Sequence, residues 1–261
     1  IECEKLGLVF NRVSGNEDLT DFPMLVSLTD ASLADTANGG KVFNSDGYDI
    51  AFTDLNGYKL DHQIEYYEET TGNYIAWVRV PVLFTAQNTE IKMLYGNPQY
   101  TTDPSVEAVW NSNYKGVYHL NNNVQDATSN GNDGSDSSTD DVTGKIVNAR
   151  DFDNSNDTIT IPTNGWSETS GTFSAWVNTD GVSTGPDYIF GHTTTTGWTC
   201  RLQLYLENTS EQLYLGLGDD HSKHTNIQIL NAGDWYHVSL TWDGADYEVL
   251  VNGVTRATGT Y

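Results

Sequence analysis

Short runs of alternating apolar and polar residues, each closed by turn residues, follow one another along almost the whole chain. Residues 74–80, Tyr-Ile-Ala-Trp-Val-Arg-Val, send Ile75, Trp77 and Arg79 to one side and the residues between them to the other. A period of two is typical of a half-buried β-strand. Strands this closely spaced, with turn signals between them, predict an all-β fold of sandwiches or barrels and not βαβ units.

Further runs of the same kind predict the remaining strands. They cover residues 22–28, 48–52, 61–67, 89–95, 115–120, 158–161, 171–177, 188–190, 201–206, 212–217, 235–242 and 247–251. Asn252-Gly253 is a strong two-residue hairpin signal, so a strand is expected to begin at Val254. Pro81 is expected to end the run that precedes it. Residues 32–40 form a short helical candidate, which the glycine pair at its end would terminate.

The length of 261 residues fits one large all-β domain or two ordinary ones. The strand pattern loosens between residues 101 and 113, and we place a boundary near Asn111. The expected domains are a β-sandwich at residues 1–112 and a second one at residues 113–261. Residues 126–141 contain almost no apolar side chain and are expected to form a surface loop.

The chain has 36 acidic and 12 basic side chains, which gives a formal net charge of −24. This excess repels phosphate backbones, so we expect no nucleic-acid partner. No run of about 18 apolar residues occurs, so we expect no membrane insertion within the chain. The sequence begins at Ile1 without a basic and apolar leader, so we expect a signal peptide either to have been removed or never to have been present. The scattered carboxylates fit either a solvated surface or the capture of divalent cations.

Two family resemblances emerge from ordered blocks of sequence. Residues 21–110 resemble the domain of unknown function 2341, and the blocks that carry this are residues 21–28, 49–54, 60–65, 76–81 and 94–98. Residues 114–261 resemble a LamG-like, concanavalin A-like jelly roll, and its blocks are residues 126–132, 152–159, 173–177, 235–244 and 251–253. The pair implies two consecutive β-sandwiches, as in bacterial and archaeal surface proteins. It implies the fold more closely than the function, because such sandwiches host many roles.

The LamG-like pattern normally continues with two or three strands beyond its Asn-Gly hairpin, whereas this chain stops at Tyr261. We therefore expect a jelly roll that lacks its last strands. A strand at residues 117–120 would then lack a neighbour and expose unpaired backbone groups. Two explanations remain open. The chain is part of a longer protein, or a strand from a neighbouring subunit fills the gap.

Calcium is the candidate cofactor, because it takes six to eight oxygen ligands and the polar loops are rich in oxygens. The predicted ligands are Asp126, Asn130, Asp133, Asp153 and Asp157. Asp126 and Asn130 match positions one and five of a calcium loop, but Ser137 stands at position twelve, so an EF-hand is rejected. The alternative is a turn network in which these side chains bond their own backbone. His221 and His224 are a weaker candidate for zinc or copper, against a solvated hairpin tip.

Exposed aromatic rings beside amides would suit a glycan. Three aromatic residues near turn-like sequence are the candidate ligand-binding residues: Trp166, Tyr188 and Trp198. Four other aromatic residues lie in alternating runs and are expected in the core: Trp77, Trp176, Trp235 and Trp242.

We expect no catalytic residues and no enzyme activity. Glycoside hydrolases need two carboxylates about 5 to 10 Å apart. Retaining enzymes of the concanavalin type use Glu-x-Asp-x-Glu on one strand, and this run is absent. Glu65 with Glu68 and Glu69 is the nearest approach to it. The nucleophile motif Gly-x-Ser-x-Gly and a phosphate-binding glycine loop are also absent.

Two further features are open from the sequence. Cys3 and Cys200 either form a disulfide, as an exported protein allows, or stay separate. Asn156 and Asn208 stand in N-glycosylation acceptor patterns.

Together these features predict a non-catalytic extracellular or cell-surface protein with a structural or adhesive role. One form of it is a filament subunit that associates with itself through an open sheet edge. The alternative is a carbohydrate-binding module of a secreted or surface protein, with glycans as partners.

Overall fold

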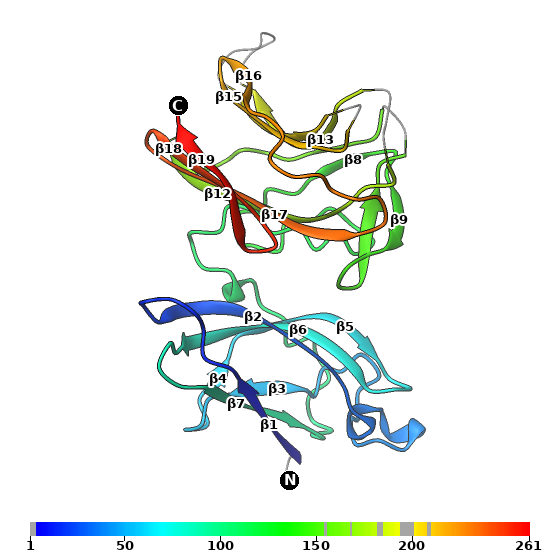
Figure 1. Cartoon of the computed structure of the whole chain (residues 1–261). Coiled ribbons are helices and arrows are strands. Elements are labelled where there is room, and N and C mark those ends of the chain that lie inside the picture. Colours follow the sequence, from blue (N-terminus) through cyan, green and yellow to red (C-terminus); the bar gives the residue numbers. More distant parts are fainter. Residues whose placement is uncertain (1–3, 154–155, 168, 182–184, 194–200, 208–209) are drawn as a thin grey trace. The chain divides into compact units, whose positions relative to one another are not determined.

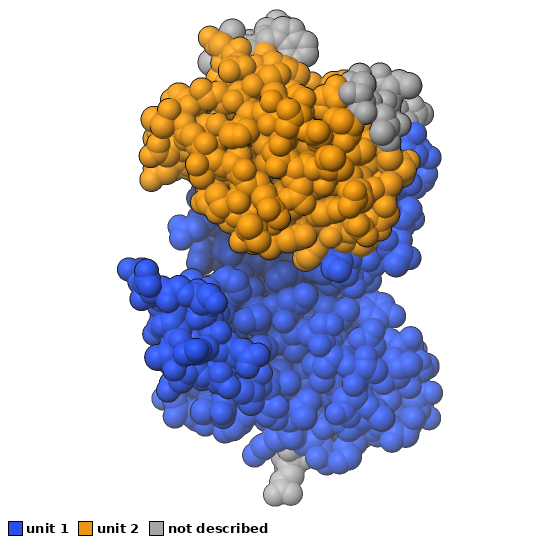
Figure 2. Space-filling model, viewed as in Figure 1, with its two compact units in different colours: residues 1–164 blue, residues 165–261 orange. Residues whose placement is uncertain are grey.

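The computed structural model describes residues 4–153, 156–167, 169–181, 185–193, 201–207 and 210–261. In these residues the protein is almost entirely β, with three short 3₁₀ helices (Figure 1). It divides into two compact units, residues 1–164 and residues 165–261, which Figure 2 distinguishes by colour. No helix in the described ranges is long and apolar enough to cross a membrane. The predicted all-β fold is confirmed.

Unit 1 contains two antiparallel sheets. The strand order of one is β1 (Glu4–Phe10), β7 (Thr89–Tyr95), β3 (Ala51–Thr53) and β4 (Lys59–Leu60). The strand order of the other is β2 (Leu19–Thr29), β6 (Asn73–Leu83) and β5 (His62–Glu68). The predicted helical stretch is two 3₁₀ helices, η1 (Ala31–Leu33) and η2 (Thr36–Asn38). Gly39 ends η2 with φ 87°, a left-handed conformation that glycine adopts without strain.

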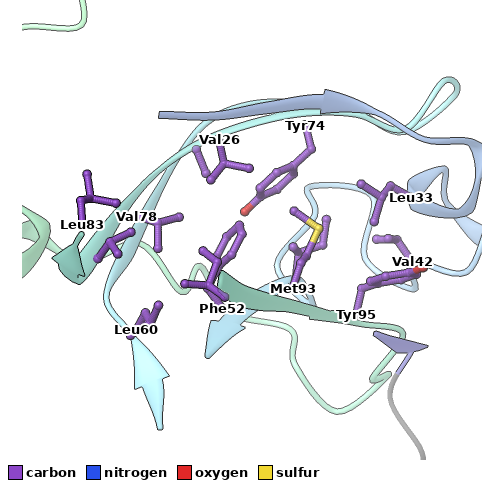
Figure 3. Close-up of a cluster of buried hydrophobic side chains, with 14 residues drawn as sticks. Val26, Leu33, Val42, Phe52, Leu60, Tyr74, Val78, Leu83, Met93 and Tyr95 are labelled. Carbon is purple, nitrogen blue, oxygen red and sulfur yellow. The ribbon is translucent and has the colours of Figure 1, made fainter. Parts of the chain in front are cut away.

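The core of unit 1 lies between its two sheets (Figure 3). β6 alternates as predicted, so Tyr74, Ala76 and Val78 face inward and are buried. Phe52 of β3 and Met93 of β7 meet them from the opposite sheet and are also buried. Two sheets packed face to face over one apolar core form a β-sandwich, as predicted for this half of the chain.

β6 continues through Pro81 to Leu83, so the predicted end of the strand at Pro81 is wrong. β2 pairs with β6 along its whole length, with Leu19 opposite Leu83. β5 pairs with β6 only as far as His62, which lies opposite Val78. At Pro81, β6 therefore has β2 as a neighbouring strand on one side and no paired strand on the other. A proline, which has no N–H to donate, is tolerated at such an edge position.

Residues 115–120 form no strand, so this prediction is also wrong. The Val117 N–H donates to Oδ1 of Asp126 at 3.0 Å, and the Val117 carbonyl accepts from the Ala127 N–H at 2.8 Å. Backbone groups of this segment are thus satisfied by the polar loop that follows it. The unpaired central strand that we expected here, as the reason for strand donation, does not exist.

Two small antiparallel ladders complete unit 1, after η3 (Glu107–Val109). They pair β9 (Asp140–Thr143) with β10 (Asn148–Asp151), and β8 (Ser135–Ser137) with β11 (Thr158–Thr160). The tract at residues 126–141, expected to be a surface loop, contains β8 and the start of β9. Every residue of these two strands is exposed, but Thr128, Asn132 and Thr139 of the same tract are buried, so the tract is only in part the surface loop that we expected.

Unit 2 contains two four-stranded sheets. The order of one is β12 (Ser170–Asn178), β17 (Trp235–Asp243), β18 (Asp246–Val251) and β19 (Val254–Thr260). The order of the other is β13 (Asp187–Thr193), β14 (Arg201–Leu206), β15 (Leu213–Gly218) and β16 (Asp220–His224). Asn252 and Gly253, at φ 52° and 73°, form the turn between β18 and β19, so the predicted hairpin and the start at Val254 are confirmed.

The two sheets of unit 2 enclose a second apolar core. Leu204 and Leu215 from one sheet meet Val238 and Val249 from the other, and all four are fully buried. This is the second β-sandwich that the sequence predicts. Among the four tryptophans expected in a core, Trp242 is buried. Two are only half-buried: Trp77 and Trp235.

Trp176 is 42% exposed, so its predicted place in the core is wrong. The inward positions of β12 belong to Phe173 and Val177, which pack against the core. Trp176 stands one position before Val177 and therefore points outward. It lies edge-on to His237, its partner on β17.

The sequence pattern places the domain boundary at residues 112/113, whereas the compact units divide at residues 164/165. Hydrogen bonds within unit 1 join residues from both sides of the predicted boundary. Nδ2 of Asn121, for example, donates to the Glu65 carbonyl at 3.2 Å. The boundary at 112/113 stays a prediction. Of the cysteines and acceptor asparagines, Asn156 lies in an exposed turn, and the other three lie outside the described residues: Cys3, Cys200 and Asn208.

Candidate ligand-binding face

The outer side of the β13–β14–β15–β16 sheet carries polar and aromatic residues. Leu204 and Leu206 of β14 point to the core of unit 2, so the alternate residues Arg201, Gln203 and Tyr205 point the opposite way. An outward face of a sandwich is usually solvated, yet these three residues are all at most 5% exposed. We call the outward side of this sheet the β14 face.

Three tyrosine rings form a row across the β14 face. Tyr188 on β13 pairs with Tyr205 on β14, which pairs with Tyr214 on β15. The ring centroids are 5.4 Å apart for the first pair and 5.6 Å apart for the second. Tyr188 is 46% exposed and Tyr214 is partly exposed, while Tyr205 is buried between them. The row therefore presents two accessible rings on either side of a fixed central one.

Gln203 places an amide beside this row. Its cross-strand neighbours are Gly191 on β13 and Gly216 on β15, which have no side chain to bond it. Gln203 is 5% exposed, and its Oε1 atom has no hydrogen-bond partner among the described residues. A buried amide oxygen without a partner costs about 1–3 kcal/mol, so the Gln203 oxygen is free to accept a hydrogen bond from a water or from a bound molecule.

His221 of β16 contacts the central tyrosine of the row, Tyr205. The Tyr205 hydroxyl donates to the His221 carbonyl at 3.1 Å and lies 3.0 Å from Nδ1 of the same residue. A hydroxyl has one proton, so the Nδ1 atom is the donor in the second contact. Burial, and then the charge of Arg201, lower the pKa of His221, and burial raises the pKa of Tyr205. Both side chains are therefore neutral near pH 7 in this face.

The structure places the predicted ligand-binding residues in different positions. Tyr188 belongs to the β14 face. Trp166 does not, because it stacks on Phe190 at 5.8 Å, and Phe190 stacks on the core residue Phe173 at 4.3 Å. Trp166 therefore covers the inner side of β13, opposite to Tyr188. Trp198 lies outside the described residues.

The sequence interpretation missed four residues of the β14 face, Arg201, Gln203, Tyr205 and Tyr214, and considered His221 only as a metal ligand. The signal for three of them was present, because residues 201–206 alternate Leu with Arg, Gln and Tyr. That pattern shows that the polar residues share one side of a strand. It does not show that the shared side is buried.

The predicted calcium ligand Asp126 is fully engaged by its own loop. Its Oδ1 atom accepts from the N–H groups of Val117 and Thr128, each at 3.0 Å. Its Oδ2 atom accepts from the Thr128 hydroxyl at 2.8 Å and from the Asn132 N–H at 3.0 Å. A carboxylate has about four acceptor positions, so protein donors occupy all of them. This is the geometry of the turn network that the sequence left open as the alternative.

The other predicted ligands lie near the same loop or in a second one. Asn130 donates through Nδ2 to the Tyr114 carbonyl at 2.8 Å, and Oδ1 of Asp133 accepts from the Asp126 N–H at 2.9 Å. The hydrogen bond to Asp157, and then its charge, raise the pKa of Asp153, so these two carboxyls are close together.

Among the described residues, no three His, Cys, Asp or Glu side chains gather closely enough to hold a metal ion. His221 contacts Tyr205 and His224 contacts Tyr247, so the two histidines have different partners. Calcium stays a prediction.

Two family models match the chain. Residues 46–169 match the domain of unknown function DUF2341, and residues 153–261 match the concanavalin A-like lectin/glucanases superfamily. The chain carries a DUF2341 domain followed by a concanavalin A-like domain. This is the order that the sequence resemblances indicated, and the β14 face lies entirely within the concanavalin A-like domain.

Two solved structures are also similar to the chain. One is domain 4 of AbnA, an extracellular GH43 arabinanase from Geobacillus stearothermophilus in complex with arabinotriose. It is 22% identical, with a TM-score of 0.44 over 55% of this chain and 72% of that one. The other, a Bacteroides ovatus protein described as carbohydrate-binding, is 14% identical, with a TM-score of 0.33 over 100% of this chain and 65% of that one. No curated protein sequence matches the chain. The family models therefore define the domain order.

The DUF2341 domain contains a second polar cluster, which the sequence did not predict. Oε2 of Glu65 accepts from Trp77 Nε1 at 3.0 Å and lies 2.6 Å from Nδ1 of His119. Oε1 of Gln63 accepts from Trp110 Nε1 at 3.0 Å and lies 3.0 Å from Nε2 of His119. An indole nitrogen only donates, so Gln63 Oε1 is an acceptor and both ring nitrogens of His119 face acceptors. The ring is therefore held between the two oxygens.

This cluster joins β5 and β6 to the segment that follows η3. Both His119 nitrogens are engaged, so the ring is not placed to take a proton from a substrate. We therefore assign the cluster a structural role in the DUF2341 domain. The sequence interpretation placed His119 in a strand and considered Glu65 only as a catalytic acid, because nothing in the pattern brings the two residues together.

Proposed function

We propose that the protein is a non-catalytic carbohydrate-binding module and that the β14 face of its concanavalin A-like domain is the binding surface. The observation that carries this proposal is the buried Oε1 atom of Gln203, which has no hydrogen-bond partner among the described residues and lies beside the row of tyrosine rings. A saccharide presents hydroxyl groups that donate to such an oxygen and C–H faces that pack on an aromatic ring. Convergent polar groups set among apolar surface are typical of small-ligand sites.

The family match supports a saccharide over other ligands. The superfamily that residues 153–261 match is named for lectins and glucanases, which bind and cleave saccharides. The six residues that form the β14 face include no carboxylate: Tyr188, Arg201, Gln203, Tyr205, Tyr214 and His221. Glycoside hydrolysis needs a pair of carboxylates. Binding without cleavage is therefore the form that we propose.

An extracellular or cell-surface location, with an adhesive role, accompanies this proposal. Polysaccharides are abundant outside cells, and a chain with a net charge of −24 stays soluble there without attraction to nucleic acid. Self-association through a sheet edge, such as β12 or β19, stays a prediction. We predicted a filament because residues 115–120 looked like an unpaired strand, and these residues form no strand. Light scattering at several protein concentrations would detect such association.

Affinity gel electrophoresis of the full chain against β-glucan, xylan and galactomannan tests the proposal. We expect at least one polysaccharide to retard the wild-type protein, and Tyr188→Ala to weaken that retardation at least tenfold. Trp176→Ala is the matched control, because Trp176 is similarly exposed but lies on the other sheet of the same unit. The absence of retardation by any of the three, or an equal loss in both variants, would contradict the proposal.

A further inference from the structure

We propose that the first sandwich carries a second binding site, for a neutral saccharide, in a groove beside Phe43. The groove has a volume of ≈ 490 Å³, within the range of about 300–1,000 Å³ that is usual for small-ligand sites. Its lining includes Glu4, Lys41, Phe43 and Pro98. It lies in unit 1, so it is a different site from the β14 face.

One buried carboxylate fixes the two segments that line the groove. Oδ2 of Asp49 accepts from the Phe43 N–H at 2.9 Å and from the Gly96 N–H at 3.2 Å. Oδ1 of Asp49 accepts from the Asn44 N–H at 3.0 Å. Asp49 is 4% exposed, and charge-assisted bonds in such a position are strong. The groove is therefore preformed, which lowers the entropic cost of binding.

Phe43 and Pro98 supply an apolar surface in the groove. Phe43 is 53% exposed, and its backbone N–H is held by the buried Asp49 carboxylate. The C–H face of a sugar ring would cover such a ring and remove it from water.

An ion pair gives the groove its polar chemistry. Nζ of Lys41 lies 2.7 Å from Oε1 of Glu4, and both side chains are about half exposed. The pair offers a donor and an acceptor side by side. Neighbouring hydroxyls of a sugar both donate and accept, so they bond the two groups without separating them. An anionic ligand would meet the Glu4 carboxylate and a net charge of −24. These features favour a neutral saccharide.

The test uses the full chain and measures binding by affinity electrophoresis to β-glucan, xylan and galactomannan, with polygalacturonate as the acidic probe. Phe43→Ala and Lys41→Met are made in the wild type and in Tyr188→Ala, which lacks a ring of the β14 face. Tyr58→Ala is the matched control, since Tyr58 is 72% exposed in the same unit but does not line the groove. Melting curves check that each variant is folded.

We expect Tyr188→Ala to retain weak binding to a neutral polysaccharide, and Phe43→Ala to lower that binding at least tenfold. Lys41→Met should lower it at least threefold, and Tyr58→Ala should change it less than twofold. Unchanged binding in both groove variants would overturn the groove and leave the β14 face standing. Loss in Phe43→Ala with no loss in Tyr188→Ala would overturn the β14 face and leave the groove standing. Tighter binding of polygalacturonate than of the neutral probes would overturn the neutral-saccharide assignment, and no binding at all would overturn both sites.

Discussion

Nδ1 of His119 lies 2.6 Å from Oε2 of Glu65, a carboxylate whose side chain is only 4% exposed. The two residues come from parts of the sequence 54 positions apart, and their contact fixes the segment after η3 against β5. A buried carboxylate tolerates this position only because His119 and Trp77 both donate to it. The contact therefore makes the segment and the sheet depend on each other for stability.

His119→Ala should lower the free energy of unfolding by about 2–4 kcal/mol, because it leaves the Glu65 carboxylate buried with one donor fewer. Urea denaturation followed by tryptophan fluorescence measures this, since Trp77 and Trp110 both contact the cluster. Tyr58→Ala is the control for an exposed aromatic of unit 1 and should change little. A loss below about 0.5 kcal/mol would show that the pair contributes nothing net.

Stability should fall as the pH is lowered from about 6.5 to 4, through His62. This residue is fully buried, its ring nitrogens have no side-chain partner in the part of the chain that the structure describes, and burial lowers its pKa to about 4. Between these pH values the unfolded chain binds a proton that the folded chain does not, so acid favours unfolding. The loss is on the order of 3 kcal/mol by pH 4, because the pKa of His62 is about 4 in the folded chain and 6.5 in the unfolded one, and a tenfold change in proton affinity is worth about 1.36 kcal/mol.

His62→Phe isolates this effect from the carboxylates that also titrate in acid. Phenylalanine keeps the edge-on contact with Phe52 and cannot bind a proton. As the pH is lowered, the urea midpoint of the variant should fall less steeply than that of the wild type. Parallel pH profiles for the two proteins would show that His62 is not the group responsible.

Asp126→Asn should destabilise unit 1 by about 1–3 kcal/mol. An asparagine replaces one accepting oxygen of Asp126 with an NH₂ group, which donates. In either orientation of the amide, this group meets two of the protein donors that now bond the carboxylate, and those hydrogen bonds are lost. Differential scanning calorimetry gives the size of the change. Asp133→Asn is the milder comparison, because only one hydrogen bond to its Oδ1 links it to this loop.

The same loop decides the calcium prediction. If hydrogen bonds alone fix Asp126, then neither 5 mM EDTA nor 5 mM CaCl₂, which is a hundredfold excess over a dissociation constant of about 50 μM, should change the melting temperature. A calcium ion bound to the folded state would instead stabilise it by about 2.7 kcal/mol at a hundredfold excess over the dissociation constant. A clear rise in melting temperature with calcium would support the predicted calcium site.

Gln203→Leu separates stability from binding in the β14 face. Leucine has a similar size and removes a buried amide oxygen that has no partner among the described residues, so the melting temperature should stay the same or rise. Saccharide binding should fall at the same time, because the saccharide hydroxyl loses the Gln203 Oε1 atom as its acceptor. A variant that melts lower and binds normally would mean that Gln203 is a structural residue only.

Local pattern predicted most of the two sandwiches. The alternation of β6 and the Asn252-Gly253 hairpin are local signals, and the structure has both where the sequence indicates them. Residues 115–120 look like a strand for the same local reason, but their backbone is satisfied by Asp126 and Ala127. Such loop-to-segment bonds have no period and leave no trace in a pattern.

The candidate site was harder to predict than the fold. Tyr188 was identified from its neighbouring turn, but its partners depend on strand register, which pairs it with Tyr205 and then Tyr214. The burial of Gln203 depends on what covers its side of the sheet. The strand register, and the residues that bury one side of a sheet, are set only when the sandwich is assembled. The sequence of a single strand therefore does not reveal them.

Hydrogen–deuterium exchange of the full chain, with and without an oligosaccharide from the polysaccharide that retards it most, tests the central claim most directly. The β14 face should become protected, with slower exchange in peptides covering β13, β14 and β15, and this protection should disappear in Tyr188→Ala. Saturating oligosaccharide that leaves exchange in these three strands unchanged would contradict the assignment of the β14 face as the binding surface.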